Sequence, residues 1–183
     1  KEKGKNHLKI VSYKKNLGKG NAIKTGFTHA RGNFIVITDS DLDVNPGLIP
    51  SYVEALKTND IAIASKWNPT SRTTMPMKRK ILSFGFNALS RLLTGIKMKD
   101  TQTGLKVFKR EVLEKMLPKL IVKRYAFDLE LMAACNHCGF KIIDLPVDVH
   151  IDSMVGFKEI LTMTSDMFKI AYRLRFLKYY QRS

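Results

Sequence analysis

Two short, uninterrupted apolar runs, Phe34–Ile37 and Ile61–Ala64, do most to limit what this chain can fold into. Four apolar residues in a row, without polar alternation, are typical of strands that are covered on both faces of a parallel sheet. Residues 21–30 and 48–57 carry apolar side chains at helical spacing, ahead of each run. This alternation of helix and strand predicts an α/β fold with a mainly parallel sheet flanked by helices.

The remaining segments extend this pattern, with Asn21 as a possible N-cap of the first helix. Residues 68–77 are polar, with two prolines, and predict a long surface loop. The other elements that we expect are a strand at 7–13, a helix at 80–94, a strand at Val107 and Phe108, a helix at 127–136, and a strand at 141–149 with Pro146 near an edge.

The charge of the chain is strongly basic but uneven. There are 32 Lys and Arg residues against 16 Asp and Glu, a formal net charge of +16. Such a field favours a polyanionic partner, and nucleic acid, anionic lipid and phosphorylated small molecules all fit it. Inside the basic chain lies an acidic island relieved only by Lys57, and its members are Asp39, Asp41, Asp43, Glu54 and Asp60. Carboxylates this close repel one another unless a cation is present, so the island is a candidate cation site.

Asp39 and Asp41 follow directly after the first apolar run. Carboxylates at the end of a buried strand stand at the edge of the sheet where ligands bind in open α/β folds. Two residues apart in an extended segment, they point to the same side and offer the hard oxygen ligands that Mg²⁺ or Mn²⁺ uses together with a diphosphate. The alternative is a solvated turn. The strand ahead of the pair and the charge contrast around it favour the metal site.

Residues 16–20 read Asn-Leu-Gly-Lys-Gly and precede a helical pattern. Glycines and a cation just before a helix N-terminus can hold a phosphate through exposed N–H groups. The spacing does not match a nucleotide P-loop, and a tight strand-to-helix turn explains the glycines equally well.

Four stretches, in this order and spacing, are similar to the motifs of one enzyme family: residues 16–26, 39–42, 100–108 and 127–131. With them the chain resembles glycosyltransferase family 2, specifically the enzymes that move a hexose onto a polyprenyl (dolichyl-type) phosphate. The resemblance covers nearly the whole chain. It implies a glycosyltransferase A-type, Rossmann-like fold and a metal-dependent, inverting transfer from a nucleoside diphosphate sugar.

The chain differs from that family at its front. Members begin with strands that end in an Asp-Asp-Gly-Ser type segment, and no such segment occurs ahead of Asn16 in a sequence that starts at Lys1. We therefore expect the N-terminal strands to be missing. We assign residues 1–153 to an N-terminally incomplete catalytic domain and residues 154–183 to a basic amphipathic helical tail.

The resemblance also implies roles for single residues. Asp39, Asp41 and Asp43 would hold the metal, and Asp100 and Asp128 are the remaining acids within family motifs. A phosphate acceptor needs no general base, whereas a hydroxyl acceptor would need one, for which we choose Asp128. The expected donor-binding residues are Lys19, Gly20 and Ser40, and those expected to bind the acceptor phosphate are Lys66, Arg72, Arg79 and Lys106.

The tail alternates an apolar stripe with basic residues, a pattern typical of a helix lying on an anionic membrane surface, although packing on the domain would also explain it. No apolar run reaches the roughly 20 residues of a spanning helix, and Cys135 and Cys138 give no disulfide framework or complete zinc site. We expect a cytoplasmic protein, peripheral at the membrane. The alternatives are a family 2 enzyme with a saccharide hydroxyl acceptor and a nucleic-acid-binding module, which the acidic island disfavours.

Overall fold

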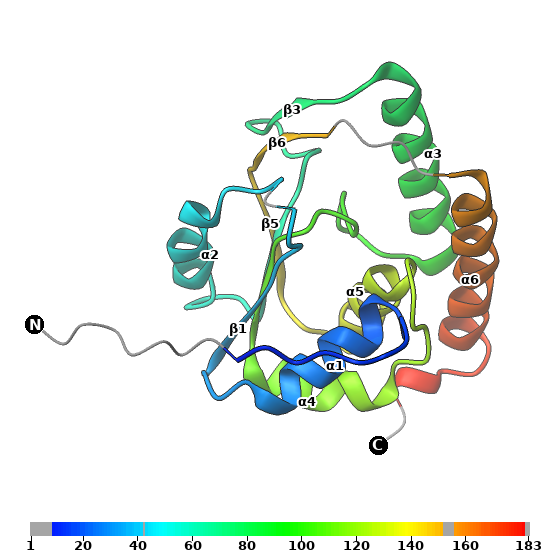
Figure 1. The fold of residues 1–183 in the computed structure, drawn as a ribbon. Helices are drawn as coiled ribbons and strands as arrows, with labels where there is room; N and C mark the ends of the chain where they lie inside the picture. The colour runs from blue at the N-terminus through cyan, green and yellow to red at the C-terminus, as the bar shows by residue number, and fades with distance from the viewer. Residues whose placement is uncertain (1–8, 42, 152–155, 182–183) are drawn as a thin grey trace, which may run out of the picture.

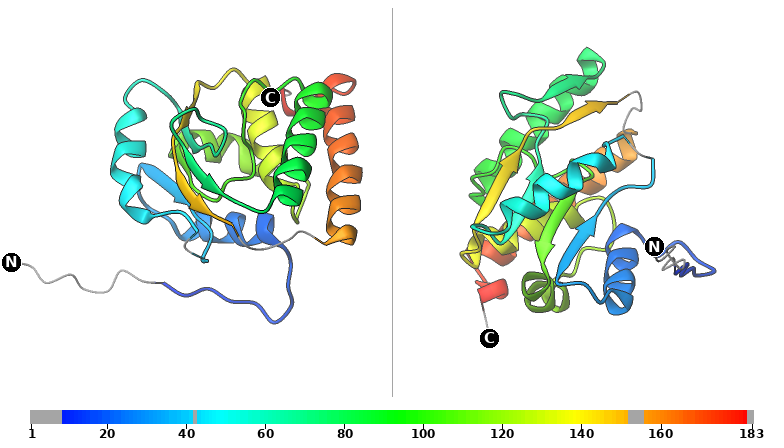
Figure 2. Two further views of the ribbon diagram at one scale, coloured as in Figure 1. Left: turned by 90° about the horizontal axis from the view of Figure 1, so that it is seen from above. Right: turned by 90° about the vertical axis from the view of Figure 1, so that its left-hand side faces the viewer.

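The chain folds into a four-stranded sheet with helices on both faces and a separate two-stranded ribbon of β3 and β6 (Figures 1 and 2). The computed structural model describes residues 9–41, 43–151 and 156–181. In chain order the elements are α1 (Lys19–His29), β1 (Phe34–Ile37), η1 (Pro46–Leu48), α2 (Ile49–Ala55), β2 (Ile61–Ala64), β3 (Arg72–Thr74), α3 (Met77–Thr94), β4 (Lys106–Lys109), α4 (Arg110–Met116), η2 (Leu117–Lys119), α5 (Phe127–His137), β5 (Ile142–Leu145), β6 (Asp148–His150), α6 (Phe157–Arg175) and η3 (Tyr179–Gln181).

The strand order of the larger sheet is β1-β4-β2-β5. β1, β2 and β5 run in the same direction, as predicted, whereas β4 lies antiparallel between β1 and β2. Ile35 of β1 and Ile61 of β2 both pair with Phe108 of β4. The chain therefore enters β4 at the edge of the sheet where β1 and β2 end, and this brings residues 100–105 next to the acidic segment that follows β1.

The alternation of side chains along the strands creates two apolar cores. Ile61, Ile63 and Phe108 point to one face of the sheet and pack against α4, α5 and α6. On the other face, Ala62, Ala64 and Val107 pack against Tyr52 and Leu56 of the α2 segment. Small alanines on that face let α2 approach the sheet closely. Both faces of the central strands are covered, which explains their continuous apolar runs.

Helix α6 belongs to the body of the protein. Met167, Ile170 and Leu174 on its inner side are buried in the same core as the sheet. The boundary that we predicted at residue 153 therefore precedes a packed helix and not a separate tail. The outer side of α6 keeps an exposed apolar stripe, from Phe157 to Phe176. None of the helices in the described ranges is long and apolar enough to cross a bilayer.

The carboxylate of Glu130, on α5, is hydrogen-bonded to α6 and η3 and so links these C-terminal elements to the core. Its Oε1 accepts hydrogen bonds from Nη2 of Arg173 at 2.7 Å and from the hydroxyl of Tyr180 at 2.5 Å. Its Oε2 accepts from the backbone N–H groups of Ile121 and Val122, at 2.9 and 2.7 Å. Glu130 is fully buried, and these four donors offset the cost of placing its charge in the core.

Several predicted elements differ from the observed ones at their ends. Of the strand expected at 7–13, residues 7 and 8 lie outside the described residues, and residues 9–13 form no strand. Asn21 lies inside α1, which begins at Lys19 after an N-cap at Gly18. Gly18 has φ of 89°, a conformation that favours glycine.

The strand expected at 141–149 is divided at Pro146, since β5 belongs to the larger sheet and β6 pairs with β3. The expected surface loop at 68–77 contains β3 itself. Phe34 at the start of β1 is 47% exposed, because β1 lies at the edge of the described sheet. The prediction that this strand is covered on both faces was wrong at Phe34, whereas Val36 on the same face packs against the core beside α2.

Candidate functional site

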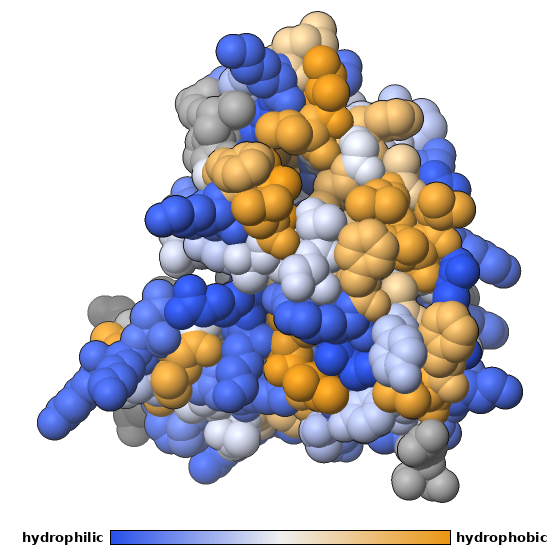
Figure 3. All heavy atoms as spheres, turned by 90° about the vertical axis from the view of Figure 1, so that its right-hand side faces the viewer, coloured by the Kyte–Doolittle hydropathy of each residue, from blue (hydrophilic) through white to orange (hydrophobic). Residues whose placement is uncertain are grey.

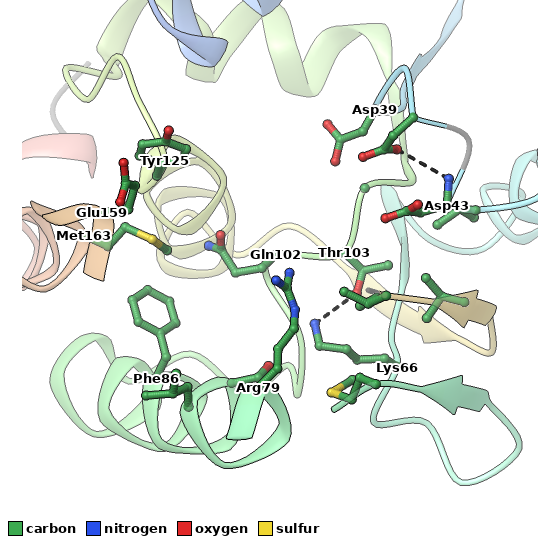
Figure 4. Close-up of a pocket in the computed structure, with 18 of the residues that line it drawn as sticks. Asp39, Asp43, Lys66, Arg79, Phe86, Gln102, Thr103, Tyr125, Glu159 and Met163 are labelled. Atoms are coloured by element: carbon green, nitrogen blue, oxygen red, sulfur yellow. Dashed lines mark hydrogen bonds between the residues drawn. The ribbon is translucent and has the colours of Figure 1, made fainter. Parts of the chain in front are cut away.

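A cavity of about 640 Å³ opens at the edge of the sheet where β1 and β2 end and the chain enters β4. Ligands bind at this edge in open α/β sheets. Figure 4 shows three groups of side chains around it, with carboxylates on one side, Lys66 and Arg79 near the middle, and Phe86 and Met163 on the far side. The lining residues outside these groups include Thr38, Gln102, Thr103, Gly104, Tyr125 and Glu159.

The carboxylate side is formed by Asp39, Asp41 and Asp43, as the sequence predicted. Asp39 is held by Lys19, whose Nζ lies 2.8 Å from Asp39 Oδ1. The N–H of Asp43 donates a 3.4 Å hydrogen bond to Oδ1 of Asp41. Ser40, expected to bind the donor, is exposed and does not line the cavity.

A chain of alternating charges leads from Asp39 into the core. Lys19 Nζ also contacts Asp128 Oδ2 at 2.9 Å, and the other oxygen of Asp128 lies 2.9 Å from Lys106 Nζ. Lys106 is 1% exposed and donates a second hydrogen bond to the carbonyl of Thr103 at 2.7 Å. Two lysines and two aspartates balance one another here, as buried charges require.

This pairing sets the ionisation of the site. Burial on its own raises the pKa of Asp128, but Lys106 and Lys19 outweigh it and hold that pKa below its usual value. Burial likewise opposes the charge on Lys19, yet Asp128 and Asp39 keep its pKa above the ordinary value. Asp128 is therefore a carboxylate and Lys19 an ammonium at neutral pH.

Two expected roles do not fit these positions. Asp128 was our choice of general base for a hydroxyl acceptor, but it is buried, does not line the cavity and is occupied by two ammonium groups. Lys106 was expected to bind the acceptor phosphate, but its ammonium is buried beneath the site as the partner of Asp128. Both residues position Lys19 and, through it, Asp39.

Lys66, just after β2, and Arg79, on α3, were expected to bind the acceptor phosphate, and both line the middle of the cavity. The ammonium of Lys66 lies 2.9 Å from Asp100 Oδ2, and the hydroxyl of Thr103 donates to the same oxygen at 2.5 Å. Burial on its own raises the pKa of Asp100. Lys66 and the hydrogen bonds have a larger, opposite effect, so the pKa of Asp100 lies below its usual value. Asp100 is buried and outside the cavity lining, so it orients Lys66 instead of touching a substrate. Arg72 is exposed on β3 and does not line the cavity.

The glycine loop serves packing. The N–H of Gly20 donates to the carbonyl of Lys123 at 2.9 Å, and that of Gly18 donates to the side chain of Asn16 at 2.9 Å. A methyl group on Gly20 would meet the ring of Phe127. The N–H of Gly20 is therefore not free to bind a donor phosphate, as we had expected of this residue. Lys19 does not line the cavity itself but contacts Asp39, which does.

The far side of the cavity is apolar, which we did not predict from the sequence. It is formed by α3 and α6, through Leu82, Phe86, Ile160 and Met163. Met75, Val149 and Ile151 line the cavity from the segments of β3 and β6. The signal was present as the inner apolar stripe of α3. Glu159 also lines the cavity, and its Oε2 lies close over Gly156, at the N-cap of α6.

The donor atoms of the carboxylate side suit a divalent ion, since carboxylate oxygens are preferred ligands of Mg²⁺ and Mn²⁺. Among the described residues, no three acidic, histidine or cysteine side chains are gathered closely enough to form a complete metal site. Mg²⁺ commonly binds through one or two carboxylates and completes its shell with water and substrate phosphates. One or two of the carboxylates of Asp39, Asp41 and Asp43 therefore fit an ion that is bound together with a diphosphate.

The two cysteines form no second site. Cys135 is fully buried and Cys138 partly so, and both are free thiols. Burial raises the pKa of each thiol, which makes them poor nucleophiles.

Comparison with known proteins gives a consistent family. Residues 1–117 match the family described as Glycosyl transferase family 2. The chain is 31% identical over 134 residues to glycosyltransferase AglD of Haloferax volcanii, which covers 72% of this chain and 22% of AglD. It is 27% identical over 180 residues to a dolichyl-phosphate beta-glucosyltransferase of Dictyostelium discoideum, with 91% and 54% covered. It is 33% identical over 165 residues to the dolichyl-phosphate beta-glucosyltransferase ALG5A of Trichomonas vaginalis, with 85% and 50% covered.

Solved structures support the fold. Glucosyl-3-phosphoglycerate synthase from Mycobacterium tuberculosis, in complex with uridine diphosphate, is similar with a TM-score of 0.63 at 19% identity, over 85% of this chain and 54% of that one. The same enzyme with Mn²⁺, UDP-glucose and phosphoglyceric acid gives a TM-score of 0.62 at 17% identity, over the same shares. The chain spans about half the length of the two dolichyl-phosphate glucosyltransferases. From the match over residues 1–117 and the motifs around the cavity, the chain belongs to glycosyl transferase family 2.

Proposed function

We propose that the full-length protein transfers a hexose from a nucleoside diphosphate sugar to a polyprenyl phosphate at the cytoplasmic surface of a membrane. The observation that carries this proposal is the composition of one cavity, which joins three carboxylates, two cations and an apolar wall. The carboxylates match a metal-bound diphosphate, the cations match a phosphate, and the apolar wall matches an isoprenoid chain. The relatives named dolichyl-phosphate beta-glucosyltransferase support the same acceptor.

The carboxylate side is the donor site in this proposal. Asp39, Asp41 and Asp43 would hold Mg²⁺ or Mn²⁺, which neutralises charge on the departing diphosphate. Lys19 stands beside Asp39 and adds a fixed positive charge on the same side. The structural neighbour solved with Mn²⁺ and UDP-glucose supports a divalent ion and a nucleotide sugar of this kind.

The cations are the acceptor site. Lys66 and Arg79 pair with the phosphate oxygens of the acceptor, and the apolar side chains of α3 and α6 contact the first isoprene units. One acceptor oxygen forms the bond to C1 of the hexose while the bond from C1 to the diphosphate oxygen breaks. An ionised phosphate carries no proton on that oxygen, so this transfer needs positioning and no general base.

A saccharide hydroxyl acceptor is the second candidate within the family. It would need a base to remove the hydroxyl proton, and the acid that we chose for this role, Asp128, is buried and paired with two lysines. The apolar far side of the cavity also suits an isoprenoid better than a sugar. Because the chain belongs to a glycosyltransferase family, we no longer propose that it is a nucleic-acid-binding module.

Helices α3 and α6 supply a surface for the membrane. Apolar side chains gather over the side of the molecule on which these helices lie (Figure 3). The exposed large apolar residues on them are Met77, Ile81, Leu82, Phe84, Leu92, Phe157, Leu161, Phe168, Tyr172 and Phe176. Lys78, Lys80, Lys158 and Arg175 lie on the same two helices, which suits anionic lipid headgroups.

An acceptor assay on the purified full-length protein tests the proposal. Labelled UDP-glucose is supplied with dolichyl phosphate or with a saccharide acceptor, in Mn²⁺, Mg²⁺ or EDTA. We expect transfer to the lipid only with a divalent ion, and a loss on the order of 100-fold in Asp41→Asn. Glu114→Gln, which changes an exposed carboxylate on α4, is the matched control and should stay active. Transfer to the saccharide alone would refute the lipid acceptor, and unchanged activity of Asp41→Asn would remove the carboxylates from catalysis.

A further inference from the structure

The side chain of Gln102 stands out among the residues that line the cavity. It comes from the segment between Asp100 and β4, on the same side of the cavity as Lys66 and Arg79. In Figure 4 its amide ends beside Arg79 and points toward the side of Met163, away from Asp39 and Asp43. Its carboxamide is polar but uncharged, so it differs chemically from the cations and from the apolar side chains that line the same cavity.

The amide nitrogen of Gln102 is buried but has no hydrogen-bond partner in the described part of the chain. Buried side-chain polar atoms without a hydrogen-bond partner also occur there on Ser65, Trp67, Thr101 and Asp144. Only Gln102 among these residues lines the cavity. A buried donor without a partner costs free energy that a ligand oxygen at the right place would recover.

The backbone of Gln102 is fixed by Asp100. Oδ1 of Asp100 accepts from the N–H of Gln102 at 2.9 Å and from that of Thr103 at 3.3 Å. Its other oxygen holds Lys66. One buried carboxylate therefore holds both the ammonium of Lys66 and the backbone from which the side chain of Gln102 extends.

We propose that Gln102 binds the hydroxyl groups of the transferred hexose and determines which sugar the enzyme accepts. The inference rests on the proposed function. In a displacement at C1, the hexose lies between the departing diphosphate and the incoming phosphate, and Gln102 lines the cavity that holds both of their predicted sites. An amide both donates and accepts, which matches a sugar hydroxyl, whereas Lys66 and Arg79 only donate.

The test compares ligands that differ only in the sugar. Binding of UDP-glucose and of UDP to the full-length protein is measured by calorimetry with Mn²⁺, for wild type and Gln102→Leu. We expect Gln102→Leu to bind UDP-glucose about tenfold more weakly, the loss of one neutral hydrogen bond, and to bind UDP unchanged. In transfer assays, the preference for UDP-glucose over its 4-epimer UDP-galactose should shrink. Gln181→Leu alters an exposed glutamine of η3 and is the matched control, with both affinities unchanged.

Gln102→Ala removes the amide without adding an apolar branch, and it should give the same result if Gln102→Leu is poorly folded. Equal losses of UDP and UDP-glucose affinity in a folded variant would overturn the inference. So would a raised KM for dolichyl phosphate with unchanged binding of UDP-glucose, since Gln102 would then serve the acceptor. If the wild-type protein neither binds UDP-glucose nor transfers its sugar, the proposed function is wrong. This result comes from the wild type alone, so it is distinguished from a failure of the inference about Gln102.

Discussion

Gly104 lies directly against the carboxylate of Asp39. A Cβ atom built on Gly104 would lie 2.7 Å from Asp39 Oδ2 and 3.2 Å from its Cγ. Real Cβ atoms essentially never approach a neighbour so closely, so any side chain at position 104 displaces Asp39. The entry of the chain into β4 thus sets where the first of the metal-binding candidates can stand.

Gly104→Ala should therefore inactivate the enzyme without unfolding it. Moving a group by about 1 Å in an active site can cost on the order of 100-fold in rate. We expect a loss of that size in metal-dependent transfer, with a thermal midpoint close to that of wild type. Gly26→Ala is the matched control, because nothing lies within 4 Å of its added Cβ on α1. Full activity of Gly104→Ala would show that Asp39 is free to move without consequence.

Gly20→Ala should behave in the opposite way. Its added methyl group meets the ring of Phe127 in the core, and such overpacking costs about 1–3 kcal/mol. We expect a lower unfolding midpoint in urea and, where the variant is folded, donor affinity close to that of wild type. A variant as stable as wild type that has lost donor binding would restore Gly20 to the donor site.

Asp128→Asn should destabilise the protein, because it leaves the ammonium of Lys106 buried with a neutral partner. Removing one member of a buried ion pair costs about 3–5 kcal/mol. The measurement is the free energy of unfolding in urea at neutral pH. The same loss in a variant with Lys106→Met added would show that the two side chains act as one unit.

The stabilisation by Asp128 should also depend on pH in a defined direction. The folded-state pKa of Asp128 is lowered, so its contribution is complete above the unfolded value of about 4 and is lost as the pH falls through the folded value. Between neutral and acid pH, wild type should lose more stability than Asp128→Asn. In transfer assays near neutral pH, no ionisation of Asp128 should appear in the rate profile. A titration near pH 7 that vanishes in Asp128→Asn would contradict this assignment.

Lys66→Met should raise the KM for the phosphate acceptor. Hydrogen bonds to a charged group contribute about 1.5–3 kcal/mol, which corresponds to about 10- to 150-fold in affinity. Lys66→Arg should recover part of the loss because it keeps the charge. Arg72→Met is the matched control, since Arg72 is exposed on β3 outside the cavity, and its KM should match wild type. If Arg72→Met raised the KM for the acceptor more than Lys66→Met did, the acceptor would bind near β3 and not at Lys66.

The outer stripe of α6 should bind anionic membranes. Leu161 and Phe168 are 55% and 53% exposed, and burying each in lipid gains about 1.5–3 kcal/mol. Changing both to Glu should lower sedimentation with phosphatidylserine-containing vesicles by tenfold or more, on the order expected from that burial. Thr162→Glu adds a charge to an exposed polar position of the same helix and serves as control. If both variants lost membrane binding equally, the effect would come from the added negative charge and not from the apolar stripe.

Local pattern predicted much of the fold. The apolar runs at Phe34–Ile37 and Ile61–Ala64 are strands, and the apolar spacing of residues 80–94 belongs to α3. The direction of β4 could not be predicted in this way, because Val107 and Phe108 look the same in parallel and antiparallel pairing. Pro146 was recognised as a position near an edge, but only the partner strands show that it separates two sheets.

The site was predictable where residues close in sequence act together. Asp39, Asp41 and Asp43 share one wall of the cavity because a single strand end presents all three. The roles of Lys106 and Asp128 depend on partners from distant elements, and a lysine is almost never expected in a core. Gln102 escaped notice because an unpaired amide is a property of the folded cavity, and no local pattern of residues reveals it.

The four hydrogen bonds of Glu130 have a practical consequence for shortened versions of this protein. Two of its donors, Arg173 and Tyr180, come from the last described helix and the turn after it. A truncation that removes them leaves the buried carboxylate of Glu130, in the first turn of α5, with two of its four donors. Versions made for crystallisation therefore have to retain everything through Gln181, even when the oily outer stripe of α6 is replaced to improve solubility.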